Sequence, residues 1–330
     1  MKELKIYDQR MISKYFSVRS GETKLGEKIG LVSGLEELKK TSAQFIIFGI
    51  PEDIGVRANY GKAGTSAAWE AFLSAFLNVQ VNPYLNPENL ILLGELAVSE
   101  EMHKAANIDI SDPNYHQKLG DLVVKIDEKV SAVVQAIIGA GKTPVIIGGG
   151  HNNAFGNIKG ASKALQRPIN VINIDAHTDL RKPDYRHSGN GFSYALKNAF
   201  LKRYSVYGLH ENYTPGYIFE DMRNSEDLRF VLLEDLQEDR ISAFSKSLNF
   251  VKEDSFGLEL DCDAIKNFPS SAVSPSGFSL DDARQLLRLA AKEKNCTYLH
   301  VCEASENAIF PTGKALSYLI TDFIKTKNHD

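Results

Sequence analysis

Three short motifs collect six residues of the types that bind metal ions. The first motif is a GGGH run, the second has D-x-H-x-D spacing and the third has D-x-D spacing. The six candidate ligands are His151, Asp175, His177, Asp179, Asp261 and Asp263. Four carboxylates packed together without a cation would repel one another and need large pKa shifts. Two histidines and four aspartates form an oxygen-rich set that suits Mn²⁺ better than Zn²⁺ or copper.

The number of candidate ligands favours two metal ions over one. Six protein ligands are too many for one small cation that must also hold water, but they suffice for two cations that share bridging carboxylates. Two cations that share a water molecule lower the pKa of that water toward neutrality. The sequence therefore predicts a two-metal site that activates water for attack.

Each motif directly follows a short apolar run of the kind found in buried strands. Eight such runs alternate with segments of helical spacing, of which 115–140 is the clearest. The runs are 44–50, 89–96, 144–149, 169–175, 204–209, 229–233, 255–261 and 297–302. This alternation predicts an α/β fold, a three-layer sandwich with an eight-stranded, mostly parallel sheet. Ligands of such sheets bind at the carboxyl ends of the strands, where the three motifs lie.

Composition excludes several classes of protein. The chain has 330 residues, of which 43% are hydrophobic and 24% charged, as in ordinary globular proteins. Its net charge of −4 offers no positive field for nucleic acid or anionic lipid. Three scattered cysteines fit neither a disulfide framework nor a metal clip, and we find no apolar run of membrane-spanning length. We therefore expect one cytoplasmic domain over residues 1–330, with a small molecule rather than nucleic acid or membrane as its partner.

We also predict the structure of two segments and the surroundings of two single residues outside the motifs. Residues 97–114 are predicted to form a surface loop, and 267–277 a loop that overhangs the site. Cys262 is expected to pack in the core. His187 is close enough in sequence to the site to be a proton carrier, but it is expected to be a solvent-exposed loop histidine. The glycines before His151 do not fit a dinucleotide-binding loop, because a G-x-G-x-x-G motif would need glycine at position 153.

The three motifs, in this order, resemble those of the ureohydrolase family, which includes arginase, agmatinase and formimidoylglutamase. Further likeness lies in GIPED at 49–53, in NYGKAG at 59–64 and in a glutamate at the end of the last strand. The resemblance implies an arginase-like fold with two Mn²⁺ ions. It implies that one ion is bound by His151, Asp175, Asp179 and Asp261, and the other by Asp175, His177, Asp261 and Asp263.

The same resemblance implies hydrolysis of a C–N bond in a linear amidine or guanidine. Asp179 would take a proton and pass it to the departing nitrogen. Glu303 would hold the cationic amidinium through charge-assisted hydrogen bonds. A single-metal deacetylase of related fold would need fewer ligands, and a non-catalytic metal-binding relative stays a further alternative.

Within the family the chain looks most like formimidoylglutamase, which implies formimidoylglutamate as substrate, glutamate and formamide as products, and a role in histidine metabolism. The likeness rests on GGGH, on DLR at 179–181 and on SGNGF at 188–192. Three departures bear on the substrate: Asn190 and Gly191 replace Thr-Pro, Glu259 replaces a small hydroxyl residue, and 264–267 lacks Asp-Pro. An arginase or agmatinase that releases urea is the alternative.

Formimidoylglutamate carries two carboxylates, so its site should offer donors beyond the metal ions. An arginine fork matches a carboxylate with two hydrogen bonds. The expected substrate-binding residues are Arg181, Arg186, Ser188, Asn190 and Glu303. The sequence is also compatible with a homo-oligomer.

Overall fold

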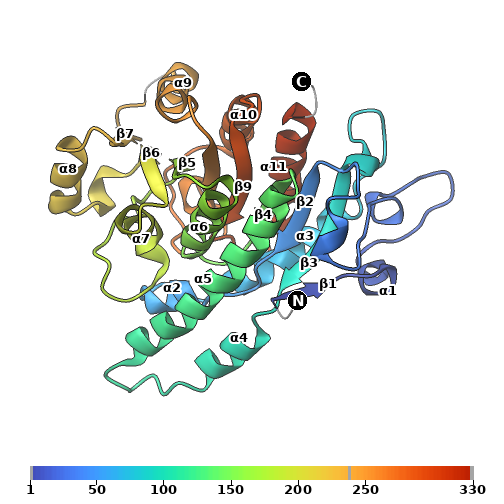
Figure 1. Cartoon of the computed structure of the whole chain (residues 1–330), viewed down its shortest axis with the longest axis horizontal. Helices are drawn as coiled ribbons and strands as arrows, with labels where there is room; N and C mark the ends of the chain where they lie inside the picture. The colour runs from blue at the N-terminus through green and yellow to red at the C-terminus, as the bar shows by residue number, and fades with distance from the viewer. Residues whose placement is uncertain (1–2, 237–238, 328–330) are drawn as a thin grey trace.

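A nine-stranded, mostly parallel sheet forms the centre of the molecule (Figure 1). A computed structural model describes residues 3–236 and 239–327. The strand order is β1-β3-β2-β4-β9-β8-β5-β6-β7, and only the β1–β3 pair is antiparallel among the described strands. The strands are β1 Leu4–Ile6, β2 Phe45–Gly49, β3 Leu90–Leu96, β4 Thr143–Ile147, β5 Ile169–Ile174, β6 Leu201–Leu209, β7 Leu228–Leu232, β8 Phe256–Asp261 and β9 Cys296–Cys302.

Each of the eight predicted apolar runs overlaps a strand, but the predicted number of strands is wrong. The missed ninth strand is β1, which has three residues and pairs along the edge of the sheet with β3. Its sequence, LKI, is too short to stand out from the charged segment around it. Sheet pairing, and not local pattern, makes this segment a strand.

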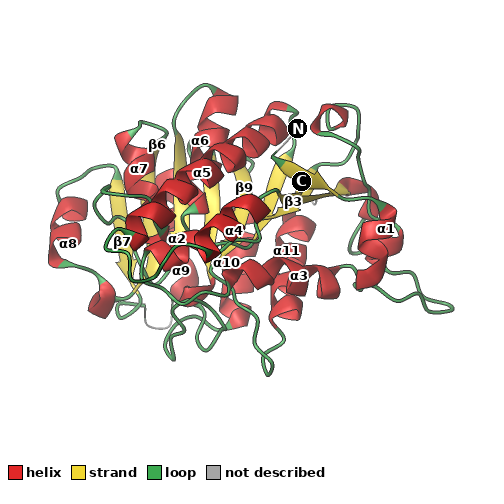
Figure 2. Ribbon diagram, turned by 90° about the horizontal axis from the view of Figure 1, so that it is seen from below, coloured by secondary structure: helices red, strands yellow, loops and turns green. Residues whose placement is uncertain are grey.

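Helices cover both faces of the sheet (Figure 2). On one face, Phe45 and Ile47 pack with α3, α9, α10 and α11. On the other face, Ile46 and Phe48 pack with α5, α6 and α7. Because both faces are buried, the central strands are apolar at consecutive positions. The helices are α1 Gln9–Ile12, α2 Ile54–Ala58, α3 Ala68–Phe76, α4 Ser99–Ala106, α5 Tyr115–Gly139, α6 Asn153–Leu165, α7 Gly191–Lys197, α8 Gly216–Arg223, α9 Arg240–Val251, α10 Leu280–Ala291 and α11 Thr312–Lys327.

The prediction of a loop over 97–114 is wrong in its first half, which contains α4. This helix is short and mostly polar, and it packs on α5 through the buried Ala105. Glu101 of α4 also pairs with Lys129 of α5 at 2.8 Å. The stabilising partner is distant in the sequence, so the local pattern did not reveal the helix.

The predicted loop over 267–277 is confirmed, because it contains no helix or strand of the sheet. It follows β8, and Ala272 donates its backbone N–H to Asp263 Oδ1 at 3.1 Å. The loop therefore lies against the end of the strand that carries the third motif.

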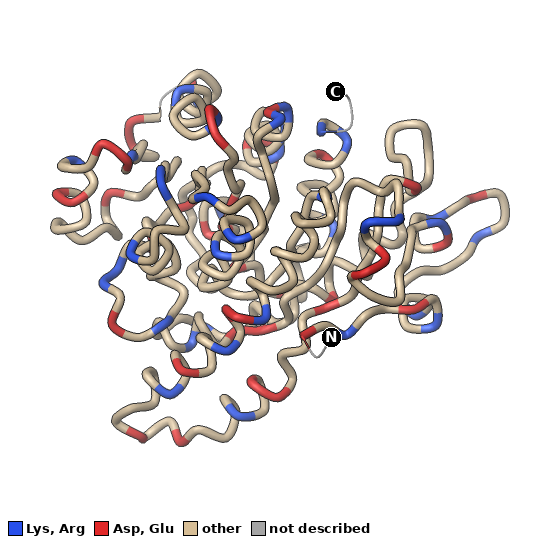
Figure 3. Tube along the Cα trace, in the orientation of Figure 1, with Lys and Arg blue, Asp and Glu red and all other residues tan. Residues whose placement is uncertain are grey.

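The outer surface mixes both signs of charge. Lys and Arg alternate with Asp and Glu along the outer helices and loops (Figure 3). Among the described residues, we find no helix with the length and apolar character needed to cross a membrane.

Candidate metal centre

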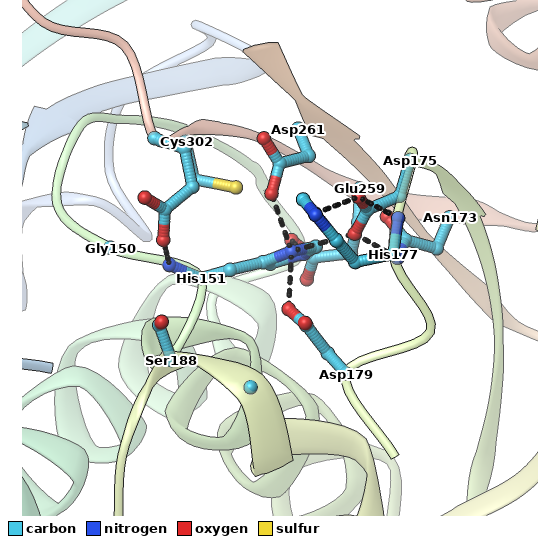
Figure 4. A network of polar contacts seen from close by, with 12 residues as sticks. Gly150, His151, Asn173, Asp175, His177, Asp179, Ser188, Glu259, Asp261 and Cys302 are labelled. Carbon is cyan, nitrogen blue, oxygen red and sulfur yellow. Dashed lines mark hydrogen bonds and ion pairs between the residues drawn. The ribbon is translucent and has the colours of Figure 1, made fainter. Parts of the chain in front are cut away.

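Three of four adjacent strands carry the six predicted ligands to one edge of the sheet. β4, β9, β8 and β5 are neighbours in the strand order, and they run parallel to one another. His151 follows β4, the D-x-H-x-D motif follows β5, and Asp261 ends β8 with Asp263 directly after it. Ligands that lie far apart in the sequence thus meet at the carboxyl ends of neighbouring strands (Figure 4).

A deep cluster forms around the imidazole of His151. Its Nδ1 lies 3.1 Å from Asp175 Oδ2, 2.9 Å from Asp179 Oδ2 and 3.1 Å from Asp261 Oδ2. One ligand atom from each of these four residues falls within 4.8 Å of all the others. The imidazole is 1% exposed, whereas the Asp179 side chain at the edge of the cluster is 11% exposed.

An outer cluster forms around His177, whose side chain is 31% exposed. Its Nδ1 lies 3.5 Å from Asp175 Oδ1 and 3.8 Å from Asp263 Oδ2. Asp175 therefore presents one oxygen to each histidine, which is the position of a carboxylate that bridges two cations. Asp261 Oδ2 faces His151, and its Oδ1 accepts the backbone N–H of Asp263 at 2.7 Å.

The electrostatics of these clusters fit a pair of divalent cations. Burial and the neighbouring carboxylates raise the pKa of Asp179, Asp261 and Asp263. Although burial opposes it, the facing carboxylates raise the pKa of His177 to about 10. Negative charge is thus crowded where protons or cations must compensate it. Oxygen and imidazole donors in this number suit Mn²⁺.

Backbone strain marks two of the predicted catalytic residues. Asp179 has φ +49° and Glu303 has φ +60°, a left-handed conformation that is uncommon for residues other than glycine. Such conformations cost roughly 1–3 kcal/mol each and concentrate at functional sites. The fold holds both carboxylates in unfavourable backbone geometry, and both line the pocket above the metal centre.

The loop that carries His151 depends on a buried glutamate that sequence reasoning did not single out. Glu52 is fully buried, and it accepts the backbone N–H of Gly150 at 3.1 Å and the Asn153 amide at 2.7 Å. Gly149 has φ +73°, and a Cβ there would lie 2.9 Å from Glu52 Oε1. The available signal was a charged residue three positions after an apolar strand, in GIPED.

Cys302 is a second residue that the motifs did not reveal. Its Sγ lies within 4.8 Å of ligand atoms of His151 and Asp261. Burial raises the pKa of this thiol well above its usual value. The thiol therefore forms part of the wall of the deep cluster. Cys262 is buried in the hydrophobic core, as predicted.

A pocket opens over the metal centre. The pocket wall includes the candidate ligands His177, Asp179, Asp261 and Asp263. Glu303 also lines it, and its Oε1 accepts the backbone N–H of His151 at 2.6 Å. Burial, followed by repulsion from Asp263, raises the pKa of Glu303 to about 8. A cationic group in the pocket would favour the ionised form of this carboxyl group.

Arg181 and Ser188 line the same pocket and share one partner. Arg181 Nη1 donates to Asn59 Oδ1 at 3.1 Å, and Asn59 Nδ2 donates to Ser188 Oγ at 3.1 Å. Asn59 was not predicted as a site residue, although it lies in the NYGKAG segment. These three polar side chains form one side of the pocket mouth.

Arg186 and Asn190 lie outside the pocket, which corrects the expectation that they contact substrate. Arg186 is 2% exposed, and its guanidinium binds Asp127 with two hydrogen bonds of 2.9 and 3.2 Å. It also donates to Asn190 Oδ1 at 2.5 Å. Because Arg186 binds the buried carboxylate of Asp127 on α5, it stabilises the loop and does not face the pocket. Arg181 lines the pocket instead.

The prediction that His187 is exposed to solvent is wrong. Its side chain is buried, and Nδ1 accepts the backbone N–H of Gly189 at 3.1 Å. Burial lowers the pKa of His187 to about 4. The histidine therefore stabilises the turn that leads to Ser188.

Comparison with known proteins gives consistent relatives. A family model described as "Arginase family" matches residues 43–310. The chain is similar to the formimidoylglutamase of Macrococcus caseolyticus, with 28% identity over 263 residues that cover 78% of this chain and 76% of that protein. It is similar in structure to the Mn²⁺ form of formiminoglutamase from Trypanosoma cruzi, with a TM-score of 0.74, 20% identity, and coverage of 92% and 98% of the two chains. Formimidoylglutamase from Bacillus subtilis gives a TM-score of 0.76 at 16% identity, over 96% of this chain and 95% of that one.

Proposed function

The chain belongs to the arginase family, and we propose that it is a binuclear manganese hydrolase that cleaves a C–N bond of a linear amidine. The observation that carries this proposal is the pair of clusters joined by Asp175, which presents one carboxylate oxygen to each histidine. Relatives named formimidoylglutamase and a related structure with Mn²⁺ support it.

The proposed ligands divide between the two clusters. The deep ion would be held by His151, Asp175, Asp179 and Asp261, and the outer ion by Asp175, His177, Asp261 and Asp263. Bound in this way, two Mn²⁺ ions would lower the pKa of a shared water molecule and make it a nucleophile for the amidine carbon.

Asp179 and Glu303 are the proposed catalytic residues. Asp179 belongs to the deep cluster and also lines the pocket, so we assign it the transfer of a proton to the departing nitrogen. Glu303 lines the pocket from the end of β9, and we assign it the binding of the amidinium group. The positive charge of that group would hold Glu303 in its ionised form.

We propose formimidoylglutamate as the substrate, with glutamate and formamide as products. The support is the name of the curated relatives together with the position of Arg181. In the described part of the chain, Arg181 is the one arginine or lysine that lines the pocket. Its guanidinium can pair with a substrate carboxylate, and Asn59 and Ser188 beside it offer further polar contacts.

A panel of three substrates tests this assignment. Purified protein loaded with Mn²⁺ is offered formimidoylglutamate, arginine and agmatine, and both formamide and urea are measured. We expect formamide from formimidoylglutamate at a higher kcat/KM than urea from either guanidine. Preferential release of urea would replace the substrate assignment with an arginase or agmatinase activity.

The reaction would then belong to histidine metabolism, and we propose that it takes place in the cytoplasm within one catalytic domain of residues 1–330. A small-molecule partner rather than nucleic acid agrees with the net charge of −4. Cys262, Cys296 and Cys302 are free and buried, which suits a reducing compartment.

A further inference from the structure

A buried glutamate and a buried histidine lie on the side of His151 that faces away from the carboxylates. Glu259 is in β8 and His300 is in β9, and the two residues are directly paired in the sheet. Both are 0% exposed. Ionisable side chains are rarely buried unless they have a partner, because burial of a charge without a partner is costly. The contacts of these two residues therefore indicate what each of them does in the interior.

Hydrogen bonds connect these residues in a line. Glu259 Oε2 lies 2.5 Å from His300 Nδ1, and Glu259 Oε1 accepts the Tyr298 hydroxyl at 2.7 Å. His300 Nε2 lies 3.3 Å from the carbonyl oxygen of Gly148, in the loop that leads to His151. Glu259 is therefore fixed from two sides by groups of β9.

The same carboxylate faces the second ring nitrogen of His151. His151 Nε2 lies 3.7 Å from Glu259 Oε2, whereas Nδ1 faces three carboxylate oxygens at 2.9–3.1 Å. Figure 4 shows Glu259 beside this cluster. A histidine that binds a metal ion through one nitrogen usually donates the N–H of the other to a carboxylate, carbonyl or water. Among the described residues, the buried Nε2 has no hydrogen-bond partner, and Glu259 Oε2 at 3.7 Å is the carboxylate oxygen that faces it.

We propose that Glu259 is a positioning residue that orients His151 and keeps its proton on Nε2, so that Nδ1 is free to bind the deep metal ion. This inference rests on the metal ligands proposed above. In the ureohydrolase pattern a small hydroxyl residue precedes D-x-D, so Glu259 supplies this chain with a charged acceptor in its place. A charged acceptor makes a stronger hydrogen bond than a neutral one.

Because there are two clusters, a role of Glu259 in positioning His151 can be distinguished from a role in packing between β8 and β9. Glu259 lies close to His151 of the deep cluster, and the outer His177 faces Asp175 and Asp263 instead. Loss of a positioning residue should therefore weaken one metal ion selectively. Loss of a packing residue should lower the stability of the metal-free chain and affect both ions alike.

The test compares Glu259→Met, which removes both acceptor oxygens at similar size, with Glu259→Gln, which restores a neutral acceptor. Mn²⁺ binding to the metal-free full chain is followed by titration calorimetry and by the electron paramagnetic resonance signal of coupled Mn²⁺ pairs. Thermal unfolding is measured in chelator. Glu101→Met is the matched control, because Glu101 is a buried glutamate paired with Lys129 between α4 and α5.

We expect the wild-type chain and the Glu101 variant to bind two ions. In Glu259→Met the affinity for one ion should fall about 10- to 100-fold, as for other residues that support a metal ligand. The coupled signal should then need more Mn²⁺, and Glu259→Gln should recover part of the loss. If Glu259→Met does not fold, Glu259→Gln must still show a selective loss for one ion.

Two results overturn the inference. One is wild-type affinity for both ions in the Glu259 variants, and the other is an equal loss at both ions together with a lower unfolding temperature in chelator. A wild-type chain that binds at most one ion contradicts the proposed metal ligands themselves, and so separates that failure from a failure of the role of Glu259.

Discussion

The deep and outer clusters use similar ligands in different surroundings. The side chain of His151 is 1% exposed and has three carboxylate oxygens within 3.1 Å, whereas that of His177 is 31% exposed and its carboxylates lie at 3.5 and 3.8 Å. The deep cluster is also supported by Glu259 and by the Glu52-bound loop. We infer that the deep cluster is the more preorganised and should hold its ion more tightly, and that the outer cluster is the more exposed of the two.

Removal of the deep histidine should have the largest effect. His151→Ala leaves the buried Asp175 and Asp261 and the partly buried Asp179 facing one another without their imidazole. Removal of one partner from a buried charged group is strongly destabilising. We expect metal content to fall and activity to drop by more than the roughly 100-fold that loss of a supporting residue can cause. Elemental analysis and kcat measure this effect.

The outer cluster offers the paired experiment, Asp263→Ala. We expect it to lose the outer ion and most activity while the deep ion stays bound. If Asp263→Ala released both ions while His151→Ala released one, the inferred order of the two clusters would be reversed.

Glu303→Gln should reduce turnover without removing metal. The change keeps the shape of the side chain but removes the charge that we assign to binding the amidinium. Because a hydrogen bond to a charged group contributes about 1.5–3 kcal/mol, we expect kcat/KM to fall roughly 10- to 100-fold. Steady-state kinetics and metal analysis on the same sample provide the measurement. Unchanged kinetics would show that Glu303 does not contact the substrate.

Arg181→Ala should raise KM for formimidoylglutamate roughly 10- to 100-fold, because a hydrogen bond to a charged group contributes about 1.5–3 kcal/mol. KM for an amidine without carboxylates should change little. Lys182→Ala is the matched control, since Lys182 is an exposed neighbour outside the pocket residues. Equal changes for both substrates would exclude a carboxylate contact at Arg181.

His187 should have a smaller effect, which appears in the pH dependence of stability, and its pKa shift is opposite to that of His177. Burial lowers the pKa of His187 to about 4, whereas carboxylates raise that of His177 despite burial. The unfolded chain therefore binds the His187 proton below about pH 6.5, and the folded chain binds it only near pH 4. Stability from His187 is complete above this window and is lost as pH falls through it, with a slope of roughly 1.4 kcal/mol per pH unit.

Denaturant unfolding between pH 7 and 4 checks this sign. His187→Gln should show a shallower loss of stability over that window than the wild-type chain. Identical pH profiles for the two proteins would contradict the assigned burial effect.

Sequence predicted the parts of the molecule whose signal is local. Buried parallel strands are apolar at consecutive positions, and metal ligands at alternate positions after them stand out, as in the motif that begins at Asp175. Parallel topology then implies that these residues meet at one edge. The α4 helix and β1 were missed because their stability comes from α5 and β3, which are distant in the sequence.

The sequence also did not reveal the direction in which loop side chains point. From the sequence alone, Arg181 and Arg186 were equally good candidates for binding the substrate. In the structure Arg186 binds Asp127 on α5, and no local sequence pattern predicts that pair. Glu259 appeared only as a departure from a family pattern. Its contacts with His300 and His151 depend on the order of β8, β9 and β4 in the sheet.

The metal stoichiometry of the wild-type chain tests the central claim most directly. Protein produced with manganese, or metal-free protein reloaded with Mn²⁺, is freed of loosely bound ions and measured by elemental analysis against protein concentration. We predict close to two Mn²⁺ per chain. A value of at most one ion in fully loaded protein would contradict the two-metal centre.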